Sequence, residues 1–252
     1  MHHSTTVFSP SGTPILDRTV GELVAERPSR SRVFQAHDIG FCCQGSRTLR
    51  QACELKGLAP EQMEEELAAE MAAGKAPVVN LATLALPELR ARLVDIHHGF
   101  LRRELPRLHA MAERVAHVHG GHTPSLVELY NRFSTLAGEL VLHVEQTERD
   151  LVQGLIAMEQ GEAINASFAT TLSSLEEDHA TMEPALKGIR TLTHEFTPPP
   201  EACNTYRALF AGLEDLNADL QHHIHLENAV LFPTVRAELN EASAGDLSGV
   251  GQ

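Results

Sequence analysis

The sequence predicts an all-α protein, an up-down-up-down four-helix bundle preceded by a small helical N-terminal domain. Only 4% of its 252 residues are aromatic, with no tryptophan and two tyrosines, whereas sandwiches and barrels depend on aromatic and β-branched strands. Four long stretches in the second half repeat apolar residues three and four positions apart, which keeps these residues on one face of a helix. Each of the four apolar stripes also contains one histidine.

The small helical domain is expected over residues 15–75, where short helical patterns are separated by proline and glycine. The expected elements are a helix over 19–36 broken at Pro28, a loop over 38–45, a helix over 46–55 capped by Ser46 and ended by Gly57, and a helix over 60–73 started by Pro60. Residues 74–87 contain glycine and proline and are expected to link this domain to the bundle.

The bundle is expected over residues 85–240. Its four helices are predicted over residues 87–119, 124–160, 163–193 and 201–239, with glycines or prolines between them. Long helices joined by short loops pack antiparallel, so the chain should run up, down, up and down.

One histidine replaces an apolar residue in each stripe: His98, His143, His179 and His223. The first pair is separated by 45 residues and the second by 44. Glu227 follows His223 by four residues, which places it on the same helix face. A single histidine in such a stripe is more often a hydrogen-bonded core residue, but one per helix at matched spacing indicates a metal site on the bundle axis. A buried ionised carboxylate also needs a charged partner or a metal.

The types of ligand limit which metal ions the site can bind. Imidazole and carboxylate, with no cysteine in the stripes, suit iron, zinc or manganese and disfavour copper(I) and iron–sulfur clusters. Four histidines and a carboxylate exceed what one tetrahedral zinc ion needs, so a two-metal site is the economical interpretation, with iron preferred. A structural bundle that holds zinc or a single metal ion is the alternative.

The repeat is broken at residue 147. The partner of Glu227 on the second helix should lie four residues after His143, and this residue is Thr147. Glu148 comes next, but five residues turn a helix by about 140°, against about 40° for four. Glu148 is therefore expected to face partly outward and is a weaker candidate ligand. The site is expected to lack one carboxylate.

The other histidines in the bundle lie off the stripes and are expected to be exposed or to contact the ligands rather than to bind metal. They include His109, His117, His119, His122, His194, His222 and His225, and His97 is likewise rotated off its stripe.

Cys42 and Cys43 lie in a glycine-flanked loop just before a predicted helix, where the helix dipole favours a thiolate. Adjacent cysteines do not readily form a disulfide with each other. A redox or iron-handling role for this pair is one interpretation, and ordinary packed thiols are the other. Cys53 and Cys203 are expected to be structural.

The formal net charge of −14 argues against nucleic acid and anionic membranes as partners. No stretch is apolar enough to span a bilayer, and the polar N-terminus lacks a signal-peptide core. We therefore expect a cytoplasmic protein.

Three segments resemble the repair-of-iron-centres family, the YtfE/ScdA type of di-iron protein with a hemerythrin-like bundle. They are Asp38–Cys43 with Gly45 and Leu49 behind it, Thr197–Cys203, and His223–Pro233. The resemblance covers about residues 15–240. It implies an all-α hemerythrin-like fold with an N-terminal domain of the ScdA type that bears the vicinal cysteines.

The resemblance further implies a non-haem di-iron centre, with an oxo or hydroxo bridge, held by His98, His143, His179, His223 and Glu227. A second bridging glutamate is expected where this chain has Thr147. The implied role is the repair of iron–sulfur proteins damaged by nitric oxide or oxidants, by iron delivery or by nitric oxide reduction, and a homodimer is one expected assembly. The rival expectation is a hemerythrin-like binder or sensor of oxygen or nitric oxide without repair activity.

Overall fold

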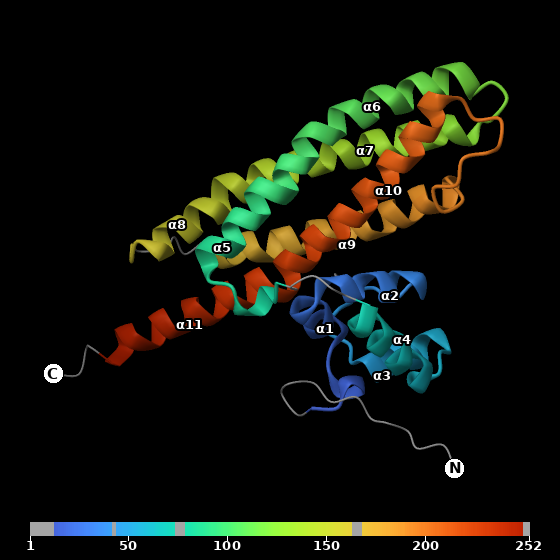
Figure 1. The fold of residues 1–252 in the computed structure, drawn as a ribbon. Helices are drawn as coiled ribbons and strands as arrows, with labels where there is room; N and C mark the ends of the chain where they lie inside the picture. Colours follow the sequence, from blue (N-terminus) through green and yellow to red (C-terminus); the bar gives the residue numbers. More distant parts are fainter. Residues whose placement is uncertain (1–12, 42–43, 74–78, 163–167, 249–252) are drawn as a thin grey trace, which may run out of the picture. The chain divides into compact units, whose positions relative to one another are not determined.

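The structure, a computed structural model, describes residues 13–41, 44–73, 79–162 and 168–248 (Figure 1). The predicted all-α class is confirmed, since these residues contain no strand and only an isolated antiparallel bridge between Thr19 and Thr48. The chain divides into two compact units, Met1–Ala85 with Ile224–Gln252, and Leu86–His223. Within the described ranges, no helix is long and apolar enough to cross a membrane.

The N-terminal part of the first unit consists of short helices. They are η1 (Ile15–Asp17), α1 (Val20–Glu26), η2 (Pro28–Arg30), α2 (Ser31–Ala36), α3 (Leu49–Lys56), α4 (Pro60–Ala73) and η3 (Leu81–Thr83). The predicted break at Pro28 and the predicted end at Gly57, with φ of 66°, are both present. The predicted cap at Ser46 is wrong, because Thr48 caps α3. Thr48 has Gln51 at the position that completes a capping box, and Ser46 has only Leu49 there.

The same unit contains the C-terminal part of the fourth long helix. This part comprises the last two residues of α10 (Asn204–His225), then η6 (Leu226–Leu231) and α11 (Phe232–Ser248). Both α1 and η3 pack against η6. Gly21 of α1 lies at this contact, where an added Cβ would meet Ala229 Cβ at 3.4 Å, an ordinary contact distance, and the carbonyl oxygen of Gly45 at a tighter 3.0 Å. The N-terminal helices therefore pack on the helical turns that directly follow His223.

The second unit holds the four bundle helices up to His223. They comprise α5 (Leu86–Ala91), η4 (Arg92–His98) and α6 (Gly99–His119); α7 (Ser125–Gln146), η5 (Thr147–Val152) and α8 (Gln153–Glu159); α9 (Phe168–Leu192); and α10. In Figure 1, α6, α7, α9 and α10 run alongside one another, and α6 packs on α7 and α7 on α9. The predicted bundle of four long helices is confirmed.

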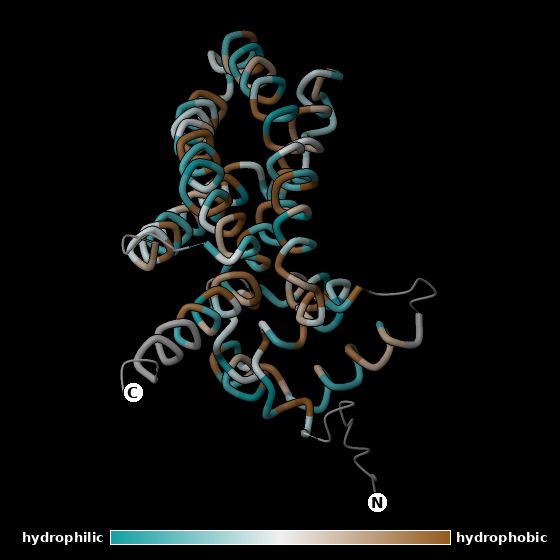
Figure 2. Tube along the Cα trace, turned by 90° about the vertical axis from the view of Figure 1, so that its left-hand side faces the viewer, coloured by the Kyte–Doolittle hydropathy of each residue, from teal (hydrophilic) through white to brown (hydrophobic). Residues whose placement is uncertain are grey.

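The predicted apolar stripes are buried. On α6 they include Leu101, Leu105, Leu108, Ala112 and Val115, and equivalent residues of α7, α9 and α10 are buried as well. Figure 2 shows this pattern as hydrophobic residues that recur at intervals along each helix among hydrophilic ones. Burying such a stripe is what stabilises a helix in a bundle, because isolated helices are marginal in water.

Three of the four long helices are interrupted by a π-helical segment, which the sequence pattern does not predict. These segments are η4, which ends at His98, η5, which begins at Thr147, and η6, which contains Glu227. A π-helical turn hydrogen-bonds to the fifth residue rather than the fourth, so it shifts the helix face of every residue beyond it. Such turns are frequent at functional sites, and here each one coincides with a residue of the predicted metal site.

Candidate metal centre

The four striped histidines are buried on four different segments. His98 ends η4, His143 lies on α7, His179 on α9 and His223 on α10, and their exposed fractions are 0%, 2%, 0% and 1%. The hydrophobic residues on either side of each histidine in its stripe pack into the bundle core, so the ring is carried inward with them. The prediction that each helix aims one imidazole inward is consistent with this burial.

The four rings are neighbours in the bundle. The ring centroids of His143 and His179 lie 4.8 Å apart, and those of His98 and His223 lie 5.2 Å apart. The Nε2 atoms of His143 and His179 are 3.3 Å apart. Two nitrogens that each lie about 2.1 Å from one ion are separated by roughly 3 to 3.5 Å, so this spacing suits two ligands of one metal. The rings of His143 and His223, at 5.7 Å, join the two pairs.

Glu227 completes the donor set. It is fully buried, with an exposed fraction of 0%, and it follows His223 by four residues, across the point where α10 ends at His225 and η6 begins at Leu226. Two groups of three candidate ligands result, His98 with His223 and Glu227, and His143 with His179 and Glu227. Within each group, one ligand atom per residue lies within 4.8 Å of the others. Glu227 is thus the one residue common to both groups.

This donor set fits iron. Each group consists of two imidazoles and one carboxylate, a combination typical of non-haem iron sites that keep open coordination positions. The described residues contribute no cysteine to either group, so soft-metal chemistry is not favoured. All five side chains are buried, which excludes the bulk water that would otherwise compete for the metal.

Carboxylates orient two of the imidazoles from outside. Glu148 Oε1 accepts a hydrogen bond from His98 Nδ1 at 2.8 Å, and Asp178 Oδ2 accepts one from His143 Nδ1 at 3.3 Å. An imidazole held through Nδ1 presents Nε2 as its ligand atom, and such partners fix the ring and raise its basicity. Asp178 is a residue that the sequence analysis missed. In the sequence Asp178 is notable only as the neighbour of His179, and this position does not predict a contact with His143.

Glu148, the weaker candidate ligand, belongs to neither group of ligands. Its Oε1 contacts His98, and its Oε2 forms an ion pair with Arg102. Burial raises the pKa of this carboxyl group, but hydrogen bonds from Arg102 and His98 outweigh burial and hold the pKa below its ordinary value. Glu148 is therefore ionised at neutral pH. Its partly outward position, with a side chain 27% exposed, agrees with the angle expected for a fifth residue.

Thr147 is fully buried at the start of η5, where the repeat would place a carboxylate. Its backbone N–H donates to the carbonyl oxygens of His143 and Val144, so the residue continues the helix that carries His143. Its hydroxyl has no hydrogen-bond partner among the residues that the structure describes.

Two histidines off the stripes have defined contacts as well. His97 Nδ1 donates to Asp219 at 2.9 Å, and its ring stacks on His223 with centroids 5.6 Å apart. His225 is buried, and its Nδ1 lies 3.2 Å from the carbonyl oxygen of Phe41. Both support the ligand helix rather than adding a ligand. Cys42 and Cys43, which directly follow Phe41 in the sequence, lie outside the described residues.

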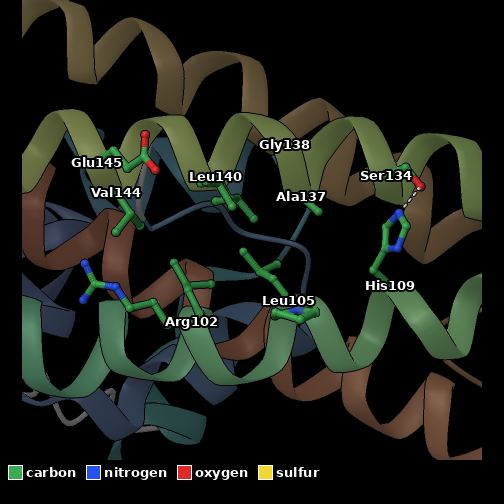
Figure 3. Close-up of a pocket in the computed structure, with 12 residues that line it drawn as sticks. Arg102, Leu105, His109, Ser134, Ala137, Gly138, Leu140, Val144 and Glu145 are labelled. Carbon is green, nitrogen blue, oxygen red and sulfur yellow. Dashed lines mark hydrogen bonds between the residues drawn. The ribbon is translucent and has the colours of Figure 1, made fainter.

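An apolar groove of about 560 Å³ runs between α6 and α7, beside the centre (Figure 3). Its walls include Leu105, Leu140 and Val144, and Arg102 and Glu145 lie at one end. At the other end, His109 hydrogen-bonds Ser134 at 3.1 Å. Since Arg102 also holds Glu148, this end of the groove lies next to the contact that orients His98.

Comparison with known proteins identifies relatives of both parts of the chain. Residues 90–235 match the model of the hemerythrin HHE cation binding domain, and residues 16–71 match a domain of unknown function, DUF542, named ScdA_N. The iron-sulfur cluster repair protein YtfE of Edwardsiella ictaluri is 36% identical over 217 residues, which are 86% of this chain and 96% of that protein. YtfE of Pectobacterium carotovorum is 32% identical with the same coverage.

A third relative is named ScdA rather than YtfE. The iron-sulfur cluster repair protein ScdA of Staphylococcus haemolyticus is 30% identical over 213 residues, which are 84% of this chain and 95% of that protein. The matches therefore include both parts of the chain, the short N-terminal helices and the histidine-bearing bundle. The chain belongs to the hemerythrin HHE family and, over most of its length, to the family of the iron–sulfur cluster repair proteins YtfE and ScdA.

Proposed function

We propose that this protein repairs damaged iron–sulfur clusters by means of a di-iron centre. Its ligands are His98, His143, His179, His223 and the shared carboxylate of Glu227. The observation that carries the proposal is the pair of ligand groups that have Glu227 in common. The relatives described above, which this chain matches over nearly their whole length, are named for iron–sulfur cluster repair. Their names support the same role here.

The protein's residues hold and orient the metals in this proposal. Glu148 and Asp178 fix His98 and His143 through Nδ1, so each ring presents Nε2 inward. When bound, the two irons supply a redox centre that can take up nitric oxide or release iron to a damaged cluster. Damaged iron–sulfur proteins are the proposed macromolecular partners, and nitric oxide or oxygen the small ligands.

The domain division proposed for this role is a cysteine-bearing domain over residues 15–75 and a metal-binding bundle over residues 85–240. In the described part of the first unit, His225 reaches the Phe41 carbonyl, so the ligand helix is tied to the segment that leads into the cysteines. We assign Cys42 and Cys43 the handling of iron or electrons during repair.

A double Cys42→Ser, Cys43→Ser variant is expected to keep its iron and lose repair, because neither thiol is among the proposed ligands. The measurement is iron per chain together with recovery of a [4Fe–4S] dehydratase that nitric oxide has inactivated. Cys203→Ser is the matched control, since Cys203 is an exposed thiol far along the chain. Undiminished recovery with the double variant would contradict the proposed thiol role.

A Glu148→Gln variant is expected to bind two irons but to hold one of them about 10–100-fold more weakly, the usual effect of losing a residue that orients a ligand. The reason is that a neutral amide lacks the charge that polarises His98 and pairs with Arg102. Iron transfer to a ferrous chelator measures this. Glu145→Gln, an exposed residue on α7, is the control. Transfer at the wild-type rate would argue against the orienting role, and fewer than two irons at saturation would make Glu148 a ligand.

The repair function itself is tested by comparing iron-loaded and metal-free protein in the dehydratase assay. We expect only the iron-loaded form to restore activity. Equal restoration by the metal-free form would refute a role for the centre. Reversible oxygen binding without any restoration would favour a carrier or sensor.

A further inference from the structure

The two halves of the candidate centre are related by a repeat that fails at one residue. Glu227 lies four residues after His223, and Thr147 lies four residues after His143. Both residues are fully buried, and each lies in a π-helical segment, Glu227 within η6 and Thr147 at the start of η5. Thr147 therefore occupies the place that corresponds to a shared carboxylate, with a much shorter side chain.

Thr147 lies on a segment that contacts elements carrying ligands of both groups. The segment η5 packs against α9, which carries His179, and the residue after Thr147 contacts His98. The Thr147 hydroxyl is buried and has no hydrogen-bond partner in the part of the chain that the structure describes. A buried hydroxyl is expected to be hydrogen-bonded, so this one is available to donate to an incoming group.

Glu148 does not supply the second carboxylate. Its two oxygens are already engaged, one with His98 Nδ1 and the other with Arg102. Moving Glu148 inward would break both contacts, and it would remove the partner that orients a ligand of the first group.

The charge of the centre favours an anion at this place. Two ferrous ions bring four positive charges and the four imidazoles are neutral ligands, whereas Glu227 and one bridging hydroxide together return only two negative charges. Excess charge in a buried site is costly unless it is paired. In addition, two imidazoles and one carboxylate leave open coordination positions on each iron. A neutral water molecule could fill such a position but would not reduce the charge.

Resting on the di-iron centre proposed above, we propose that Thr147 creates a binding site for a small exogenous carboxylate, of the size of formate or acetate. Its oxygens take the place of the missing side-chain carboxylate at the metals, and the Thr147 hydroxyl donates a hydrogen bond to it. The centre of this protein is thereby open to small anions at a position that a glutamate would close.

The test titrates full-length, iron-loaded protein in the ferric state with azide, followed by its charge-transfer absorption, and then displaces azide with acetate. Thr147→Val removes the hydroxyl and keeps the shape, and it is expected to weaken azide binding about tenfold, as for loss of a hydrogen bond to a charged acceptor. Thr147→Glu supplies the carboxylate from the chain and is expected to weaken azide and acetate binding at least about 100-fold with iron retained. Thr135→Val, an exposed threonine on α7, is the matched control.

Iron per chain is measured first, so that the two proposals fail separately. A wild-type protein that binds no iron contradicts the proposed function. If the protein binds iron but Thr147→Val and Thr135→Val bind azide with equal affinity, only the proposed anion site is overturned. The same conclusion follows if Thr147→Glu binds azide with the affinity of the wild type. If Thr147→Glu does not fold, the two valine variants decide the question by themselves.

Discussion

Replacing Glu227 with glutamine is expected to reduce the iron content from two per chain to less than one. Glu227 is the one residue common to both ligand groups, so a single substitution weakens both metal positions. A neutral amide keeps the shape of the side chain but loses the charge that binds and bridges the ions. The loss of affinity should exceed the roughly 10–100-fold typical of residues that only orient a ligand.

The measurements for this variant are metal analysis of anaerobically loaded protein and thermal unfolding with and without iron. A ligand that binds only the folded state raises its stability, so iron should raise the Tm of the wild type and leave that of Glu227→Gln nearly unchanged. The same substitution at exposed Glu145 is the control and should retain two irons. Two tightly bound irons in Glu227→Gln would show that the carboxylate is not shared.

Replacing His179 with alanine is expected to remove one iron and leave the other. His179 belongs only to the group with His143, and the group of His98, His223 and Glu227 remains intact. The variant should bind about one iron per chain, and the Mössbauer signature of a coupled pair should disappear. His117→Ala, on the exposed side of α6, controls for the loss of an imidazole elsewhere.

The outcome for His179→Ala separates two arrangements of the same ligands. If all ligands served a single ion, the wild type would bind one iron rather than two, and removal of His179 would only lower the affinity for that ion. Full retention of two irons would instead show that His179 is not a ligand.

The sequence was sufficient to predict the fold class, the four long helices and the burial of the histidines. These features follow from periodicity, because each stripe must turn inward and carries His98, His143, His179 or His223 with it. The buried position of Glu227 follows in the same way from its spacing to His223.

The orienting residues and the π-helical segments could not be predicted. The contacts of Glu148 with His98 and of Asp178 with His143 join different helices, and their relative rotation is set by packing rather than by any one-dimensional pattern. The π-helical turns at η4, η5 and η6 depend on the same packing. His225 was expected at the surface or against the ligands, and instead it is buried against Phe41, which lies between α2 and α3 of its unit.

The structure also explains why Glu148 does not supply the carboxylate that position 147 lacks. One step further along the helix turns its side chain outward, where Arg102 and His98 engage both of its oxygens. The carboxylate of Glu148, one residue after position 147, therefore orients the ligand His98 instead of binding metal. The consequence is a centre with one internal carboxylate, a feature on which its affinity for anions and its reactivity should depend.

We propose that this protein holds two irons and that the carboxylate of Glu227 is a ligand to both. The decisive experiment is Mössbauer spectroscopy with iron quantification, on wild-type protein loaded anaerobically with ⁵⁷Fe and then oxidised. We expect two irons per chain in a magnetically coupled pair in the wild type, and less than one iron per chain in Glu227→Gln. One iron per chain, uncoupled iron, or a preference for a single zinc ion under competition would contradict it.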